Sequence, residues 1–140
     1  MTAAISLVPL ATPAQAATSA WRSCSAVYAD GVETPDLVAT GGGNENFTGR
    51  NSLSNVNLYV KDTHADGHHV AVRLVTRQSD GSNHYWSWHH LYAGSGTDES
   101  WLTTASDSGG IRLVWREIAL FEGSSRLTYC ATASASNPSW

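Results

Sequence analysis

The chain has 140 residues, with 8 Lys or Arg against 12 Asp or Glu, which gives a net charge of −4. The slightly acidic sequence shows no nucleic-acid footprint, which needs a basic face. A chain of this length forms one domain, which buries roughly two-thirds of the surface of the unfolded chain.

The first sixteen residues hold an apolar run that ends in Ala14-Gln15-Ala16. Small residues at the two alanine positions are typical of a signal-peptidase site, so we expect a signal peptide over 1–16, cleaved after Ala16. No Lys or Arg precedes the run, and we therefore expect the basic start of the signal to lie upstream of Met1. The run is too short to cross a bilayer as a helix, and no later segment resembles a membrane span. These features predict a secreted, extracellular protein.

The two cysteines are Cys24, early in the mature chain, and Cys130, near its end. In an oxidising compartment they should pair, and the bridge would hold the first strand beside the last. A metal site is the alternative, but two cysteines so far apart do not have the spacing of zinc ligands. We therefore expect one disulfide.

Apolar and polar residues alternate along the chain, and clusters of Gly, Asn, Asp and Ser interrupt the alternation. This pattern predicts strands at 56–61, 70–75, 85–91, 111–121 and 127–131. Three glycine-rich stretches are expected to be loops: 40–44, 93–97 and 106–110.

Within the strand at 111–121 the apolar phase shifts by one residue near Arg116–Glu117, which predicts either a bulge there or a division into two strands. Short strands at this spacing indicate an all-β domain, a single antiparallel β-sandwich or small barrel stapled by one disulfide. We place this domain at 17–133 and expect a flexible C-terminal tail at 134–140.

Asp80-Gly81 lies between two alternating runs and favours a two-residue type I′ turn, because both central residues need positive φ. This turn would pair Val75 with Trp86 and Arg73 with Trp88, which puts both indoles on one face. The opposite face would belong to the core and carries Val70, Val72, Leu74 and Leu91, with Tyr85 and Thr76 at its edge.

The indole-bearing face combines Trp, Arg and His, which is the composition of an interaction hot spot. We expect Arg73 to lie over Trp88 in a cation–π contact. The predicted binding residues are Arg73, Arg77, His84, Trp86, Trp88 and His90. In the alternative interpretation the tryptophans form the inner layer of the sandwich, with the arginines at its rim.

Metal chemistry has weak candidates in His64, His68 and His69, but Asp66-Gly67 favours a turn between them, and no His-Glu-x-x-His pattern follows. We therefore predict no metal site and no cofactor. No nucleophile elbow is present, and no carboxylate pair is diagnostic. We expect Glu117 to be a bulge residue paired with arginine, and therefore expect no catalytic residue and no enzyme activity. A histidine-dependent metal-binding protein or hydrolase is the alternative.

Two non-catalytic functions fit the predicted face. As a glycan platform, Trp86 and Trp88 would project about 7 Å apart. A glycan platform needs a flat, exposed pair of rings with few charges between them, and Arg73 and Arg77 would lie between these rings. We therefore rank binding of another secreted protein above glycan binding. The six histidines lie between His64 and His90, and their titration predicts that partner binding changes between about pH 7.5 and 5.5.

The predicted signal, Cys24, Cys130 and the all-β pattern together resemble the small secreted single-disulfide β-domain proteins of actinobacteria. Some of those proteins are adaptor subunits of extracellular antagonistic particles, including the umbrella toxins. The resemblance implies an adaptor or recognition subunit of such an assembly. No diagnostic motif accompanies it, so no family residue is transferred.

Overall fold

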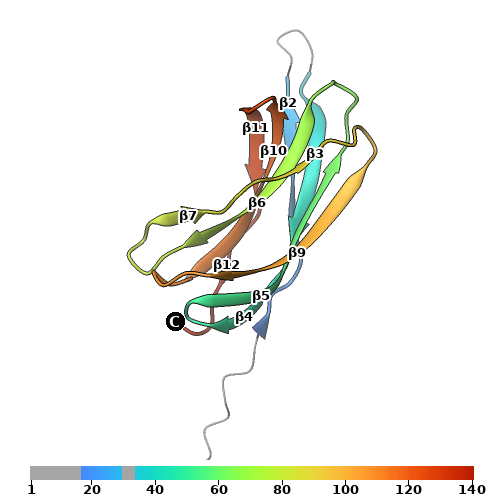
Figure 1. The fold of residues 1–140 in the computed structure, drawn as a ribbon. Helices are drawn as coiled ribbons and strands as arrows, with labels where there is room; N and C mark the ends of the chain where they lie inside the picture. Colours follow the sequence, from blue (N-terminus) through green and yellow to red (C-terminus); the bar gives the residue numbers. More distant parts are fainter. Residues whose placement is uncertain (1–16, 30–33) are drawn as a thin grey trace, which may run out of the picture.

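The structure is a computed structural model that describes residues 17–29 and 34–140 (Figure 1). The predicted signal peptide lies outside the described residues. Strands and their connections make up the whole of the described chain, which holds no helix that could cross a membrane.

The strands form two antiparallel sheets that face each other, so the predicted all-β antiparallel sandwich is confirmed (Figure 1). The first sheet contains β1 (Ala17–Thr18), β4 (Asn46–Gly49), β5 (Ser52–Asp62), β3 (Asp36–Gly43), β2 (Arg22–Tyr28) and β9 (Asp98–Ser106), with β5 at its centre. The second sheet contains β11 (Ser125–Ala131), β10 (Leu113–Glu122), β6 (His69–Arg77), β7 (Asn83–Tyr85), β8 (His89–Leu91) and β12 (Ala135–Ser136), with β10 and β6 at its centre.

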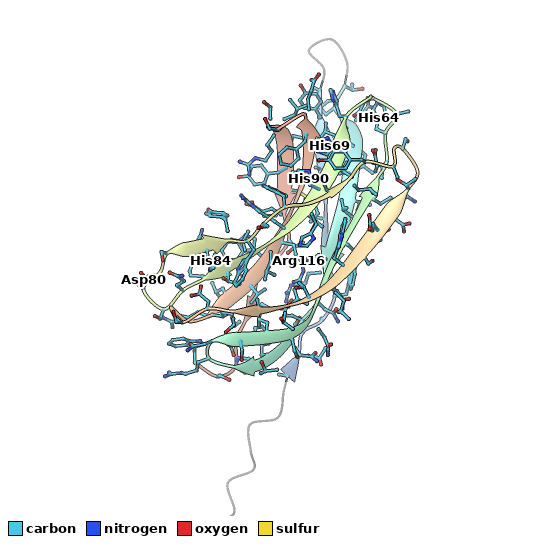
Figure 2. The ribbon with its side chains drawn as sticks, in the orientation of Figure 1. His64, His69, Asp80, His84, His90 and Arg116 are labelled. Atoms are coloured by element: carbon cyan, nitrogen blue, oxygen red, sulfur yellow. A yellow bond between two sulfur atoms is a disulfide. The ribbon has the colours of Figure 1, made fainter. Side chains whose placement is uncertain are left out.

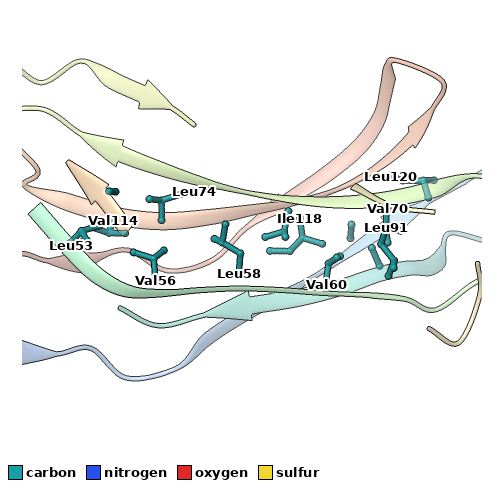
Figure 3. Packing of buried hydrophobic residues seen from close by; sticks show 14 of the residues in the cluster. Leu53, Val56, Leu58, Val60, Val70, Leu74, Leu91, Val114, Ile118 and Leu120 are labelled. Atoms are coloured by element: carbon teal, nitrogen blue, oxygen red, sulfur yellow. The ribbon is translucent and has the colours of Figure 1, made fainter. Parts of the chain in front are cut away.

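Aliphatic side chains from both sheets fill the space between them (Figure 3). The predicted core residues Val70, Val72, Leu74 and Leu91 are buried there, each at most 4% exposed. They meet the inward residues of β5, which alternate along the strand because successive side chains point to opposite faces. These residues are Val56, Leu58 and Val60.

One predicted loop is a strand. The glycine-rich stretch 40–44 lies largely inside β3, in the middle of the first sheet. Glycine is required here by space: a Cβ on Gly41 would come within 2.7 Å of Ile118, and one on Gly43 within 2.6 Å of Nε of Arg116. The missing side chains therefore let β3 approach β10 of the opposite sheet. The other two glycine-rich stretches connect strands, as predicted.

The predicted bulge at Arg116–Glu117 is wrong. β10 pairs with β6 without interruption from Leu113 to Phe121, and its only register shift against β11 falls between Leu120 and Phe121. The apolar phase changes for another reason: Arg116 occupies an inward position among core residues and is fully buried.

The buried guanidinium of Arg116 is surrounded by acceptors. It forms an ion pair with Glu45, which is also fully buried, and donates to the carbonyls of Asn44 at 2.7 Å and Asn57 at 2.9 Å. Arg22 bonds the other carboxylate oxygen of Glu45 at 2.8 Å. Burial lowers the pKa of Arg116, although the Glu45 charge opposes this effect.

The disulfide between Cys24 and Cys130 is present and joins β2 of the first sheet to β11 of the second, with a Cα–Cα distance of 6.1 Å. The C-terminal segment is not the flexible tail that the sequence suggests. β12 pairs with β10, and the side-chain amide of buried Asn137 donates to the carbonyls of Gly49 and Ile111, each at 2.8 Å. Residues 134–140 therefore belong to the folded domain.

Replacing both cysteines, C24S/C130S, should lower the free energy of unfolding by about 4–5 kcal/mol, because the bridge closes a long loop in the unfolded chain. Guanidinium unfolding of the oxidised wild type and of the variant would measure the difference. Wild-type protein kept reduced should match the variant, and equal midpoints for all three samples would contradict the prediction.

Gly43→Ala should destabilise the protein by about 3 kcal/mol or more, because the new methyl group would overlap Arg116 and the β5 backbone. Gly49→Ala is the matched control, since its Cβ would meet only the Ser52 hydroxyl, at 3.3 Å. Thermal unfolding of both variants decides the matter, and a wild-type midpoint for Gly43→Ala would refute the space argument.

Candidate binding face

The turn at Asp80-Gly81 contains three residues rather than two. The amide of Gln78 donates to the carbonyl of Ser82 at 2.8 Å, and Gly81 closes the turn with φ of 88°. A three-residue loop with a left-handed final glycine is a common hairpin connection. As a result Val75 pairs with Tyr85, one position away from the predicted partner Trp86.

An extra residue downstream restores the predicted register. Tyr85 pairs with Val75, and His89 pairs with Val72. Between these two pairs the returning chain has three residues, 86–88, whereas β6 has only two. Beyond this break His89 pairs with Val72 and Leu91 with Val70, as predicted. The side chains of Trp86 and Trp88 consequently project from opposite faces of the hairpin.

Trp86 lies on the inward side, where it packs against the main core. Its indole N–H donates to the Thr76 hydroxyl at 3.1 Å, and its ring stacks on His84 with centroids 4.1 Å apart. Nδ1 of His84 lies 2.7 Å from a carboxylate oxygen of Asp107. The predicted common face for the two indoles is therefore wrong, and Trp86 and His84 leave the candidate surface.

Trp88 lies on the outward side, beside Arg73, and the predicted cation–π contact is confirmed. The Arg73 guanidinium carbon lies 4.3 Å from the Trp88 ring centroid and 4.5 Å from that of Tyr85. Two nitrogens of the same guanidinium lie 2.8 and 2.6 Å from one carboxylate oxygen of Glu117. These contacts fix the arginine in a single orientation.

Further aromatic and charged side chains continue this surface across β10 and β11. Arg126 lies over Tyr129, 4.1 Å from the ring centroid, and its guanidinium is 3.8 Å from Glu117. Arg77 lies over Trp115 at 5.5 Å. We call this surface the outer face; its residues are Arg73, Arg77, Tyr85, Trp88, His90, Tyr92, Trp115, Glu117, Phe121, Arg126 and Tyr129.

A histidine pair lies at one end of the outer face (Figure 2). Nε2 of His69 and Nδ1 of His90 are 2.9 Å apart, and both rings pack against Phe121 and Tyr92. Burial lowers the pKa of His69, and the neighbouring His90 and His68 charges lower it further. Burial likewise lowers the pKa of His90. One ring must accept the shared hydrogen bond, so the contact requires that at least one imidazole stay neutral.

The remaining histidines are dispersed. His64 approaches Asp36 at 3.7 Å, His68 approaches Glu122 at 3.8 Å, and His89 packs on Trp101 inside the sandwich. The structure brings no three His, Cys, Asp or Glu side chains of the described ranges together in a metal-binding group. The weak candidates His64, His68 and His69 therefore share no centre.

The sequence prediction missed several exposed members of the outer face. Tyr85, Tyr92 and Tyr129 are 52%, 72% and 48% exposed. Tyr85 was placed on the core face because of the assumed two-residue turn. Tyr129 and Cys130 are neighbours in β11, so their side chains point to opposite faces. The sequence does not show that Tyr129 faces outward, because this depends on the pairing of β10 with β11.

No protein-family model, curated protein or solved structure matches this chain.

Stability should fall as the pH is lowered from about 7.5 to 5.5. Burial lowers the pKa of His69, His89 and His90 in the folded protein, so the unfolded chain binds more protons over this interval and is favoured by acid. Thermal unfolding across the interval should show a declining midpoint. The variant H90Q should decline less steeply, and a flat wild-type profile would contradict the prediction.

Proposed function

We propose that the protein is a secreted, non-catalytic binding module, an adaptor or recognition subunit that binds another secreted protein through the outer face. The observation that carries the proposal is the fixed Arg73 guanidinium, which lies over Tyr85 and Trp88 and is bound by Glu117. Arg, Tyr and Trp are the residues that dominate binding energy in protein interfaces.

Pre-organisation supports this function. Side chains that are already held by neighbours lose little conformational entropy when a partner docks, so more of the contact energy appears as affinity. Arg73 and Arg126 both share the Glu117 carboxylate, and each also lies over a tyrosine ring. The exposed tyrosines at the rim of this cluster add apolar area together with hydroxyl groups that can bond across an interface.

The geometry is less suited to a glycan platform. Such a platform needs flat, accessible rings, whereas Arg73 covers Trp88 and the edge of Phe121 packs against it, with ring centroids 5.2 Å apart. Trp86 is stacked on His84 on the inward side. Trp86 and Trp88 therefore do not lie side by side for sugar stacking.

Export is part of the proposal. The disulfide is compatible with an oxidising compartment, where such bonds persist. An extracellular adaptor would also benefit from a domain whose two sheets are covalently joined.

The variant Y85S/Y129S should lose at least about 30-fold in affinity for the partner, as expected when interface hot spots are removed. Both side chains are about half exposed, so the fold should be retained. The tagged protein would be used to recover proteins from the culture medium of its producer, and affinity for the stoichiometric partner would then be measured with the purified components.

The control is L102S, which removes a 68% exposed apolar side chain from β9 in the other sheet. It should bind as the wild type does. Retained binding by Y85S/Y129S with loss in L102S would place the interface elsewhere. Retention on insoluble polysaccharide without any protein partner would favour the glycan function instead.

A further inference from the structure

Three arginines of the described chain form no ion pair with a described carboxylate: Arg50, Arg77 and Arg112. They come from the β4–β5 turn, the end of β6 and the position just before β10. The backbone joins these segments, since the Arg112 amide donates to the Arg77 carbonyl and the Ile111 amide to the Arg50 carbonyl, each at 2.8 Å. All three therefore gather at the end of the molecule where the C-terminus lies (Figure 1).

Arg77 and Arg112 line a surface cleft of about 320 Å³ at this end, together with Gln78, Ser136 and Trp140. Nε of Arg77 donates to Asn83 at 3.1 Å. Within the described residues, the other guanidinium nitrogens of Arg77 and all those of Arg112 have no hydrogen-bond partner. Donors thus remain available in a chain whose net charge is negative.

Trp140 is held firmly as one wall of the cleft. Its indole N–H donates to the Ile111 carbonyl at 2.9 Å, and its ring packs on Gly110, where a Cβ would come within 2.7 Å. The guanidinium carbons of Arg50 and Arg112 lie 4.3 and 5.3 Å from its ring centroid. The arginines occupy the ring surface that a sugar would need for stacking.

The nearby acids are already bound within the protein. Asp107 accepts from the Gln78 amide at 2.9 Å and contacts His84, and these hydrogen bonds outweigh burial and lower its pKa. Asp80 accepts from the Ser82 hydroxyl and amide. Neither aspartate forms an ion pair with the two cleft arginines.

We propose that this cleft binds a carboxylate, presented by an acidic side chain of a protein partner. The fork of donors on a guanidinium matches the two oxygens of a carboxylate, and paired arginines create a local positive field. Arg77 also lies over Trp115 of the outer face, so the cleft continues that surface. The assignment of the carboxylate to a protein therefore rests on the proposed function.

Titration of the full ¹⁵N-labelled chain with N-acetylglutamate whose α-carboxyl is blocked as the methylamide, so that only the side-chain carboxylate is charged, tests the site directly by NMR. We expect saturable shifts of the Trp140 indole and the Gln78 side-chain amide at millimolar concentrations, and none with N-acetylglutamine blocked in the same way, which has the same shape without the charge. R112Q and R77Q should each weaken binding at least about fivefold. R126Q, on the outer face and away from the cleft, should leave it unchanged.

Glucuronate and sulfate are the competing probes. Glucuronate binding more tightly than N-acetylglutamate would overturn the protein source in favour of an acidic glycan, and equal shifts with sulfate would mean an adventitious ion only. Equal shifts with N-acetylglutamine, no shifts at all, or binding unaffected by R112Q and R77Q would remove the site. Y85S/Y129S should bind N-acetylglutamate normally, so this test fails or succeeds independently of partner capture.

Discussion

The ion pair of Arg116 and Glu45 is the constraint on which the sandwich depends. Neither side chain is exposed, and a charge in such surroundings is tolerated only when its partners satisfy it completely. The guanidinium therefore binds the carbonyls of Asn57, in β5 of the opposite sheet, and of Asn44, in the connection between β3 and β4. Gly43 provides the space that this arrangement needs. Charge satisfaction, rather than apolar area alone, sets the spacing of the two sheets at this point.

The same strand connects the core to the outer face. Arg116 points inward to Glu45, and the next residue, Glu117, points outward to Arg73, because side chains alternate along a strand. The continuous pairing of β10 with β6 thus determines both ion pairs at once. The orientation of Arg73 on the surface is in this way tied to the buried ion pair of Arg116 and Glu45.

Alternation located β5, β6, β10 and β11 and the inward face of β6, and the cysteine count indicated the disulfide, because these features depend on local pattern or compartment. Alternation did not locate β3, β4 or β9. Sequence reasoning failed where a distant contact decides the local structure. The glycines of β3 have the composition of a loop, and only their contact with Arg116 explains why they lie in a strand. Arg116 interrupts the apolar alternation as a bulge would, and only its ion pair with Glu45 explains why a charged residue points inward. At the candidate site, the outward positions of Arg73 and Trp88 were predicted correctly. The predicted position of Trp86 was wrong because the Asp80-Gly81 dipeptide suggests a two-residue turn, whereas the turn has three residues.

The stretch 86–88 compensates for the three-residue turn, and the two irregularities together preserve the register at both ends of the hairpin. Loss of one residue from either stretch alone would exchange inward and outward positions along part of the ribbon. Evolution can therefore replace side chains on this ribbon individually, but it can shorten or lengthen the ribbon only through paired events. Descendants of this gene should accordingly vary here in residue identity while holding the spacing between β6 and β8 constant.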